Sequence, residues 1–155
     1  MLLRRRTKVN ASAEAVFACI DAPEHIVKWV GGAVDHVYLT ERDPTNPVGQ
    51  RFLQKLKMGN SVRDFEGTII AWEKPTHFGL SIPTPAYSSE AHFRISPEGP
   101  ARSTVDYSID VTLHTLAARV IGTALRFPLG FFVQNQIGKL KSYAESVQAR
   151  QNGGR

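Results

Sequence analysis

The sequence predicts an α+β domain: a curved, seven-stranded antiparallel sheet around a long C-terminal helix, with two short helices after the first strand. Three observations support this. Between residues 51 and 113, segments of alternating apolar and polar residues follow one another with short turns between them, as in antiparallel strands that have one face in water. Two short amphipathic segments lie near the N-terminus. Residues 116–150 instead carry apolar residues at helical spacing.

The first third of the chain predicts a strand at 3–9, helices at 13–20 and 24–30, and a strand at 33–39. Asn10 and Ser12 offer side-chain acceptors to the first helix. Pro23 is typical of the first turn of the second helix, and Gly31 and Gly32 end it. The proline-containing segment 41–48 is expected to be a loop.

The middle of the chain predicts five strands in series. A hairpin joins 51–58 to 61–72 through Gly59 and Asn60, and further strands follow at 78–82, 87–96 and 103–113. Gly67 in mid-strand indicates a bulge or a sharp bend. In this strand, 61–72, the alternation places Phe65, Gly67, Ile69 and Ala71 on one face.

The C-terminal stretch 116–150 has two halves. In the second half, apolar residues recur at steps of three and four and predict an inner helix face, formed by Val133, Ile137, Leu140, Ala144 and Val147. The first half is apolar on nearly all sides, which favours a position covered by other structure. Pro128 either kinks one helix or begins a new helix after a separate shorter one.

Size and composition fit one domain at 1–150 with a polar tail at 151–155. No apolar run has the length and low charge of a signal peptide or a spanning helix, so a cytoplasmic protein without a transmembrane segment is expected. The lone Cys19 excludes an intrachain disulfide and is expected to be a buried apolar residue. The net charge of +5 permits an acidic partner, but we do not expect nucleic acid to be the main one.

Motifs for metal, nucleotide and nucleophile chemistry are missing from the sequence. The five histidines lack metal-ligand spacing, although His36 and His92 could meet through folding. There is no nucleophile elbow, phosphate loop or dinucleotide fingerprint. We therefore expect no metal and no cofactor. The strand alternation puts most carboxylates on the wet face of the sheet: Asp64, Glu66, Glu90, Asp106 and Asp110.

Aromatic and polar residues on the dry face are the best candidates for a ligand site. A mostly apolar pocket with a few polar groups is the usual form of a small-molecule site, although each aromatic residue is also compatible with an ordinary core. Gln54, Arg63 and Tyr107 would orient the ligand. The expected ligand-binding residues are Trp29, Phe52, Gln54, Leu56, Arg63, Phe65, Phe78, Leu80, Phe93, Tyr107, Phe127, Phe131 and Gln134. No catalytic residue is assigned.

Four stretches carry a family resemblance. They are Val-Asn-Ala-Ser-Ala-Glu-Ala-Val-Phe at 9–17, with Asp-Ala-Pro-Glu at 21–24 and Trp29; Val-Gly-Gln-Arg-Phe at 48–52; Gly-Thr-Ile-Ile-Ala-Trp-Glu-Lys-Pro at 67–75; and Leu-Lys-Ser-Tyr-Ala-Glu at 140–145. With these, nearly the whole chain resembles the START-like, Bet v 1-type helix-grip superfamily, and more narrowly its polyketide cyclase/dehydrase-like (SRPBCC) branch. The turn Gly-Pro-Ala-Arg at 99–102 departs from the Gly-Thr-Arg usual there.

This resemblance implies the helix-grip fold and a cavity for a hydrophobic ligand between sheet and C-terminal helix. It does not fix the activity, because the same fold serves several functions. The leading expectation is binding of a lipid- or polyketide-like small molecule. One alternative is a cyclase- or dehydratase-type enzyme acting in that cavity, and another is a module that contacts macromolecules through its basic surface. The oligomeric state stays open.

Overall fold

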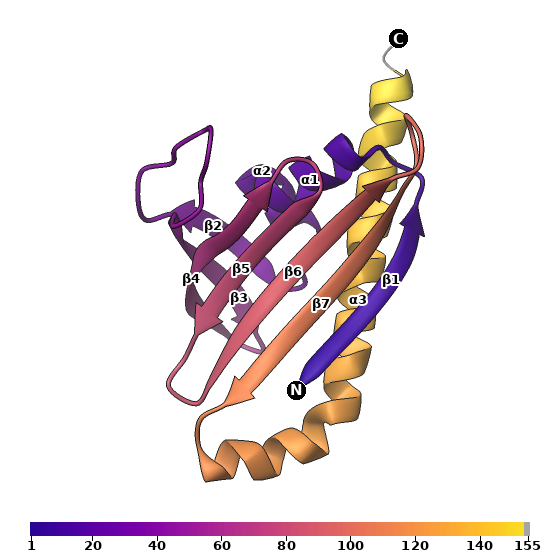
Figure 1. The fold of residues 1–155 in the computed structure, drawn as a ribbon. Coiled ribbons are helices and arrows are strands. Elements are labelled where there is room, and N and C mark those ends of the chain that lie inside the picture. The colour runs from indigo at the N-terminus through magenta and orange to yellow at the C-terminus, as the bar shows by residue number, and fades with distance from the viewer. Residues whose placement is uncertain (154–155) are drawn as a thin grey trace.

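The computed structural model describes residues 1–153, apart from the side chains of Leu125 and Phe127. Its elements follow the order β-α-α-β-β-β-β-β-β-α, as the sequence predicts (Figure 1). They are β1 (Leu2–Val9), α1 (Ala13–Asp21), α2 (Pro23–Trp29), β2 (Ala33–Tyr38), β3 (Arg51–Met58), β4 (Ser61–Glu73), β5 (His77–Pro83), β6 (Tyr87–Pro97), β7 (Ser103–Leu113) and α3 (Leu116–Gly153).

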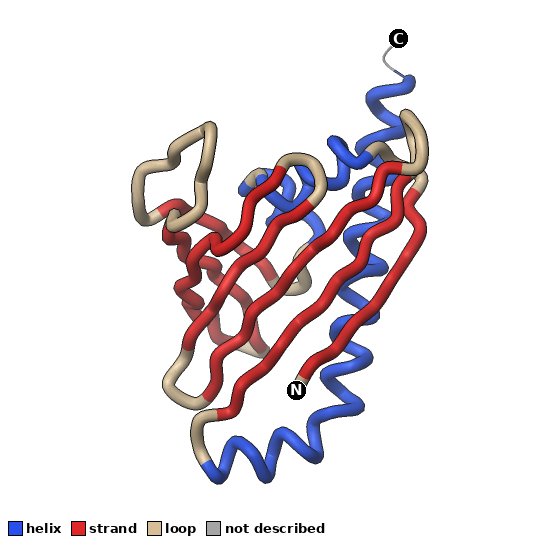
Figure 2. Tube along the Cα trace, viewed as in Figure 1, coloured by secondary structure: helices blue, strands red, loops and turns tan. Residues whose placement is uncertain are grey.

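All seven strands form one antiparallel sheet in the order β1-β7-β6-β5-β4-β3-β2. The first strand pairs with the last, from Leu2 opposite Asp110 to Val9 opposite Ser103. Every other neighbour in the sheet is also a neighbour in sequence, which the serial hairpins dictate. The predicted fold class is therefore confirmed, and Figure 2 shows the strands curving together beside the helices.

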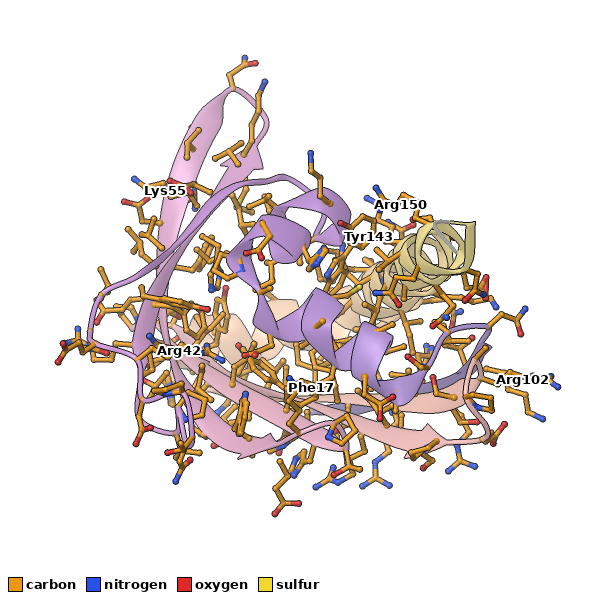
Figure 3. The ribbon with its side chains drawn as sticks, turned by 90° about the horizontal axis from the view of Figure 1, so that it is seen from above. Phe17, Arg42, Lys55, Arg102, Tyr143 and Arg150 are labelled. Atoms are coloured by element: carbon orange, nitrogen blue, oxygen red, sulfur yellow. The ribbon has the colours of Figure 1, made fainter. Side chains whose placement is uncertain are left out.

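Two short helices close one end of the concave face, as seen from above in Figure 3. The Ser12 hydroxyl accepts from the Ala15 amide at 3.1 Å and caps α1, which confirms one of the two predicted caps. Phe17 is fully buried and makes edge-to-face contacts with Trp72 and Phe78 of the sheet. Cys19 is also buried, as expected, and burial raises the pKa of its thiol to about 11.

The second half of α3 packs on the sheet edge formed by β1 and β7. Its predicted inner face is at most 8% exposed and comprises Val133, Ile137, Leu140, Ala144 and Val147. Polar contacts hold the same segment to the chain before α1. Lys141 donates to the Lys8 carbonyl at 2.9 Å, and the Asn10 amide donates to the Glu145 carboxylate at 2.9 Å.

The prediction that the first half of this helix is covered by other structure is wrong. Leu116 is 78% exposed, Val120 68% and Ile121 56%. The helix is continuous from Leu116 to Gly153 but bends by 70° between Ala124 and Pro128, where proline lacks the N–H that would bond to the Ala124 carbonyl. The bend carries the segment Leu116–Ala124 past the end of the sheet, where Figure 1 shows no other element over its outer side.

Two smaller expectations also need correction. The irregularity in β4 lies between Ile69 and Ala71 rather than at Gly67. It shifts the alternation, so that Trp72, not Ala71, reaches the α1 side and contacts Phe17. Gly67 instead makes room for the Phe52 ring, because a Cβ there would lie 2.4 Å from Phe52 Cζ.

The polar end of the chain continues the helix rather than forming a separate tail, since α3 runs through residues 151–153. Within the described chain, no single helix is long and apolar enough to cross a membrane. The bent pair Leu116–Ala124 and Pro128–Gly153 passes that test only when its two parts are taken together.

Candidate functional site

Strand pairing sets out two rows of side chains on the concave face of the sheet. Phe78 on β5 pairs with Phe93 on β6, which pairs with Tyr107 on β7. On the other half of the sheet, His36 on β2 pairs with Gln54 on β3, which pairs with Phe65 on β4. Because paired residues point to the same face, each row forms a continuous strip across three strands.

The first row is an aromatic wall that Trp29 extends. The Phe93 and Tyr107 rings stack with centroids 4.6 Å apart, and Trp29 meets Phe93 edge to face at 6.2 Å. The Trp29 Nε1–H donates to the Cys19 carbonyl at 2.8 Å, which fixes the indole at the end of α2. Burial raises the pKa of Tyr107 to about 12, so its hydroxyl is neutral and able to donate at neutral pH.

The second row carries a polar pair with an unused donor. The oxygen of the Gln54 amide, Oε1, is hydrogen-bonded to Nδ1 of His36, whose ring stacks on Phe52 at 4.9 Å. Gln54 is only 7% exposed, and its Nε2 has no hydrogen-bond partner among the described residues. A buried donor without a partner costs free energy, about 1–3 kcal/mol. This atom is therefore the strongest polar recognition feature on the concave face.

His36 is expected to be neutral at physiological pH. Burial lowers the pKa of its imidazole, and the bond to Gln54 and the nearby Asp35 charge only partly oppose this effect. A neutral imidazole can accept a proton as well as donate a hydrogen bond. The pair thus offers both an amide donor and a weak base.

A wide groove of about 1070 Å³ lies between α3 and the segment from α2 to the start of β2. Trp29, Phe131 and Gln134 line it together with Gly31, whose amide donates to the Gln136 side chain at 3.3 Å. Trp29 thus belongs both to this groove and to the aromatic wall. In Figure 3 the two short helices lie between α3 and the strands on the left of the view, and Tyr143 lies beside α3.

The other expected site residues are more dispersed. Phe52 packs against His36 and over Gly67, while Leu56 and Leu80 are half-buried on the concave face. Arg63 pairs with Leu56 near the β3–β4 turn but is exposed, and Phe131 is 76% exposed at the groove wall. The side chain of Phe127 lies outside the described residues.

Sequence reasoning missed His36 as a site residue. The sequence suggested His36 only as a metal ligand that could meet His92. In the structure His36 lies on β2, whereas His92 lies on β6 and shares a hydrogen bond of 2.9 Å with His77. The usable signal was the phase of β2, in which Val34, His36 and Tyr38 share one face. That signal is weak, because β2 is short and its register shifts between Ala33 and Asp35.

The carboxylates expected on the wet face lie there. Arg51 pairs with Glu66, Lys55 with Asp64 at 3.6 Å, and Arg6 with Asp106 at 2.7 Å. Among the described residues, no three His, Cys, Asp or Glu side chains are grouped so that they could hold a metal ion. The concave rows therefore hold one amide, one imidazole, one phenol and several aromatic rings, of which Phe78, Phe93 and Tyr107 are buried in the core.

Residues 3–145 match the family model described as polyketide cyclase / dehydrase and lipid transport. The chain belongs to this family. The match begins within β1 and ends within α3, so both concave rows lie inside it. Comparison with curated protein sequences finds no significant match.

Solved structures share the fold at low sequence identity. The Zhui aromatase/cyclase from Streptomyces sp. R1128 is 12% identical, with a TM-score of 0.72 over 94% of this chain and 93% of its own. A START superfamily protein from Mycobacterium smegmatis is 13% identical, with a TM-score of 0.71 over 97% and 98%. A norcoclaurine synthase from Thalictrum flavum is 12% identical, with a TM-score of 0.65 over 93% of both chains. At such identities the likeness concerns the fold alone.

Proposed function

We propose that this protein binds an apolar or aromatic small molecule, lipid- or polyketide-like, that carries a hydrogen-bond acceptor such as a carbonyl oxygen. The ligand lies on the concave face between the sheet and α3. The observation that carries the proposal is the buried Gln54 Nε2, which lacks a partner among the described residues. An acceptor on the ligand would satisfy this donor and remove its desolvation cost.

Most of the binding free energy would come from apolar contact. Burial of apolar surface contributes about 25 cal/mol per Å², and an aromatic ligand that reaches the wall of Trp29, Phe93 and Tyr107, whose rings are 5–8% exposed, would stack on it. The family description, which names polyketide cyclases and lipid transport, supports a hydrophobic ligand of this kind.

A pair of fluorescent probes tests the role of Gln54. Prodan carries a ketone acceptor on a naphthalene, whereas N-phenyl-1-naphthylamine is of similar size and lacks a carbonyl. The wild-type protein should bind both. Gln54→Met should weaken prodan about fivefold, the equivalent of one ordinary hydrogen bond of ~1 kcal/mol, and leave the other probe nearly unchanged. Asn60→Met, in the exposed β3–β4 turn, is the matched control.

Either of two outcomes would remove the proposal. One is that neither probe binds the wild-type protein in fluorescence titration or native mass spectrometry. The other is that Gln54→Met weakens both probes equally, since that result would report a loss of packing rather than of a specific donor.

A second candidate function is catalysis of the cyclase or dehydratase type, and the observation that favours it is the half-buried His36, whose pKa is lowered by burial. Such reactions begin with removal of a proton from the carbon next to a carbonyl group, and a neutral imidazole is a suitable base. The propionyl group of prodan has such protons. If His36 removes them, the protein should accelerate their exchange for deuterium in D₂O, and His36→Gln should abolish the acceleration while prodan still binds. Exchange at the rate of buffer alone would exclude this role.

A further inference from the structure

The segment Leu116–Ala124, called here the apolar arm, presents apolar side chains with no covering element among the described residues. Leu116, Val120 and Ile121 are each more than half exposed and fall on one side of the helix. The opposite side meets the sheet: Gly122 is buried, and a Cβ added there would lie 2.4 Å from Leu113. The arm is thus anchored by one side and open on the other.

Exposed apolar residues continue beyond the bend. Phe131 is 76% exposed and Phe132 50%. Leu2, 53% exposed, begins β1 at the end of the sheet where β7 leads into the arm. Large exposed apolar side chains that gather at one end of a protein are typical of an interaction site.

The charge around the arm indicates what covers it. Residues 111–132 contain no aspartate or glutamate, but they include Arg119 and Arg126. Arg119 and Arg126 are exposed. Arg5 of β1 adds a further positive group, since its guanidinium lies 3.2 Å from where a Gly130 Cβ would be. The carboxylate next to this region, Asp110, lies 3.6 Å from the Met1 ammonium group, which offsets its charge.

We propose that the apolar arm, with Phe131 and Phe132, docks this protein on an anionic phospholipid surface. A helix that lies in the membrane interface buries one apolar side, while arginines at its edge meet the headgroups. A second copy of this chain fits less well, because an isologous contact would bring the arginines of both copies, Arg119 and Arg126, into one interface. The proposal does not depend on the ligand site, since none of the arm's residues belongs to the two concave rows.

Vesicle sedimentation with the full chain tests the proposal. The wild-type protein should bind vesicles of phosphatidylcholine containing one-quarter phosphatidylglycerol at low salt, and bind pure phosphatidylcholine more weakly. The double variant Val120→Asp/Ile121→Asp should lose about tenfold or more in affinity. Arg119→Gln/Arg126→Gln should lose roughly 30-fold in affinity for the anionic vesicles, from ~1 kcal/mol for each basic residue near the surface.

Val48→Asp is the matched control. Val48 is 47% exposed and lies in the loop before β3, at the end of the molecule opposite the arm in Figure 1. The Val48→Asp variant should bind the vesicles as well as the wild-type protein does. Because all of these positions are exposed, near-UV circular dichroism and melting temperature should not change. Gln54→Met should also bind the vesicles normally, which separates this proposal from the ligand site.

Four results would overturn the proposal. The first is that the wild-type protein fails to bind anionic vesicles at low salt, and the second is that the Asp variant binds them as well as the wild type does. The third is that sedimentation velocity shows a dimer, which the Asp variant abolishes. The fourth is that the protein does not bind vesicles but binds RNA in a salt-dependent way, which the Asp variant leaves intact. The third result assigns the arm to a second copy, and the fourth assigns the basic charge to nucleic acid.

Discussion

Nδ1 of His36 and Oε1 of Gln54 share a hydrogen bond between the paired strands β2 and β3. The bond uses the oxygen of the Gln54 amide and leaves its nitrogen, which is buried, without a partner among the described residues. This arrangement fixes which group of the amide is available to a ligand. It also couples the recognition group to a histidine whose charge depends on pH.

The stability of the protein should fall as the pH is lowered from above neutral. Burial lowers the pKa of His36 in the folded state, and the pKa values of His77 and His92 are lowered as well. The unfolded chain, with histidine pKa values of about 6.5, therefore binds more protons in this range, and protonation favours unfolding. As the pH falls, the loss of stability begins near the histidine pKa of the unfolded chain and is complete below the pKa of the folded protein. Urea unfolding at a series of pH values measures it.

His36→Gln should flatten this pH dependence, because one of the three contributing histidines is gone. Asn60→Met, in the exposed β3–β4 turn, changes no titratable group, and as the control it should leave the dependence intact. An unchanged slope in His36→Gln would show that the His36 imidazole does not titrate differently in the folded and unfolded states.

Gly67→Ala should destabilise the protein by about 1–3 kcal/mol, the usual cost of overpacking a core. The added Cβ would lie 2.4 Å from Phe52 Cζ and 2.9 Å from the Ser81 carbonyl oxygen, so both a ring and a backbone would have to move. Phe52→Leu in the same chain should relieve part of the cost. Thermal and urea unfolding of the single and double variants measure both effects.

Gly138→Ala is the matched control for that substitution. Gly138 lies within α3 and nothing stands within 4 Å of its added Cβ. It should therefore stabilise the protein by roughly 0.5–1 kcal/mol, the helix preference of alanine over glycine. If Gly67→Ala behaved like Gly138→Ala, the close approach of Phe52 to β4 would be wrong.

The loop between β2 and β3 should depend on one ion pair. Arg42 Nη2 donates to both oxygens of Asp21 at 2.7 and 2.8 Å, each side chain is about one-fifth exposed, and Trp72 Nε1 donates to the same carboxylate at 3.3 Å. Asp21→Asn removes the charge that satisfies Arg42. We expect a loss of about 1–3 kcal/mol, and faster proteolysis of the segment 39–50.

Asp64→Asn is the comparison for that variant. Asp64 and Lys55 are an exposed pair at 3.6 Å, and such pairs contribute little, at most ~1 kcal/mol. Urea unfolding should therefore separate the two variants clearly. Equal losses would mean that the Asp21–Arg42 contact is no stronger than a solvated one.

Much of the fold could be predicted because local signals and burial agree. Ser12 caps α1, the residues from Val133 to Val147 form the inner face of α3, and the alternation around Phe93 and Tyr107 matches their burial. In each case one short pattern determines the local structure. The four stretches that resemble the helix-grip superfamily then imply how these strands and helices are arranged in the fold.

The remaining features depend on contacts that no local pattern reports. The apolar composition of residues 116–132 fits a segment covered by the rest of the chain as well as an exposed one. The bend near Pro128 determines that the first part of the helix is exposed. The irregularity after Ile69 reversed the expected sides of Ala71 and Trp72. The unused donor of Gln54 follows from its pairing with His36 across strands, and a sequence does not show which donors find partners.

The central claim is that the Gln54 amide nitrogen meets a ligand's acceptor on the concave face. Nuclear magnetic resonance of the ¹⁵N-labelled protein with prodan tests it most directly through the side-chain amide signals. The account predicts a large shift of the Gln54 Nε2–H signals and cross-peaks from them to the probe, with the Asn60 side-chain signals unmoved. Shifts confined to exposed residues, with the Gln54 signals unchanged at saturation, would contradict it.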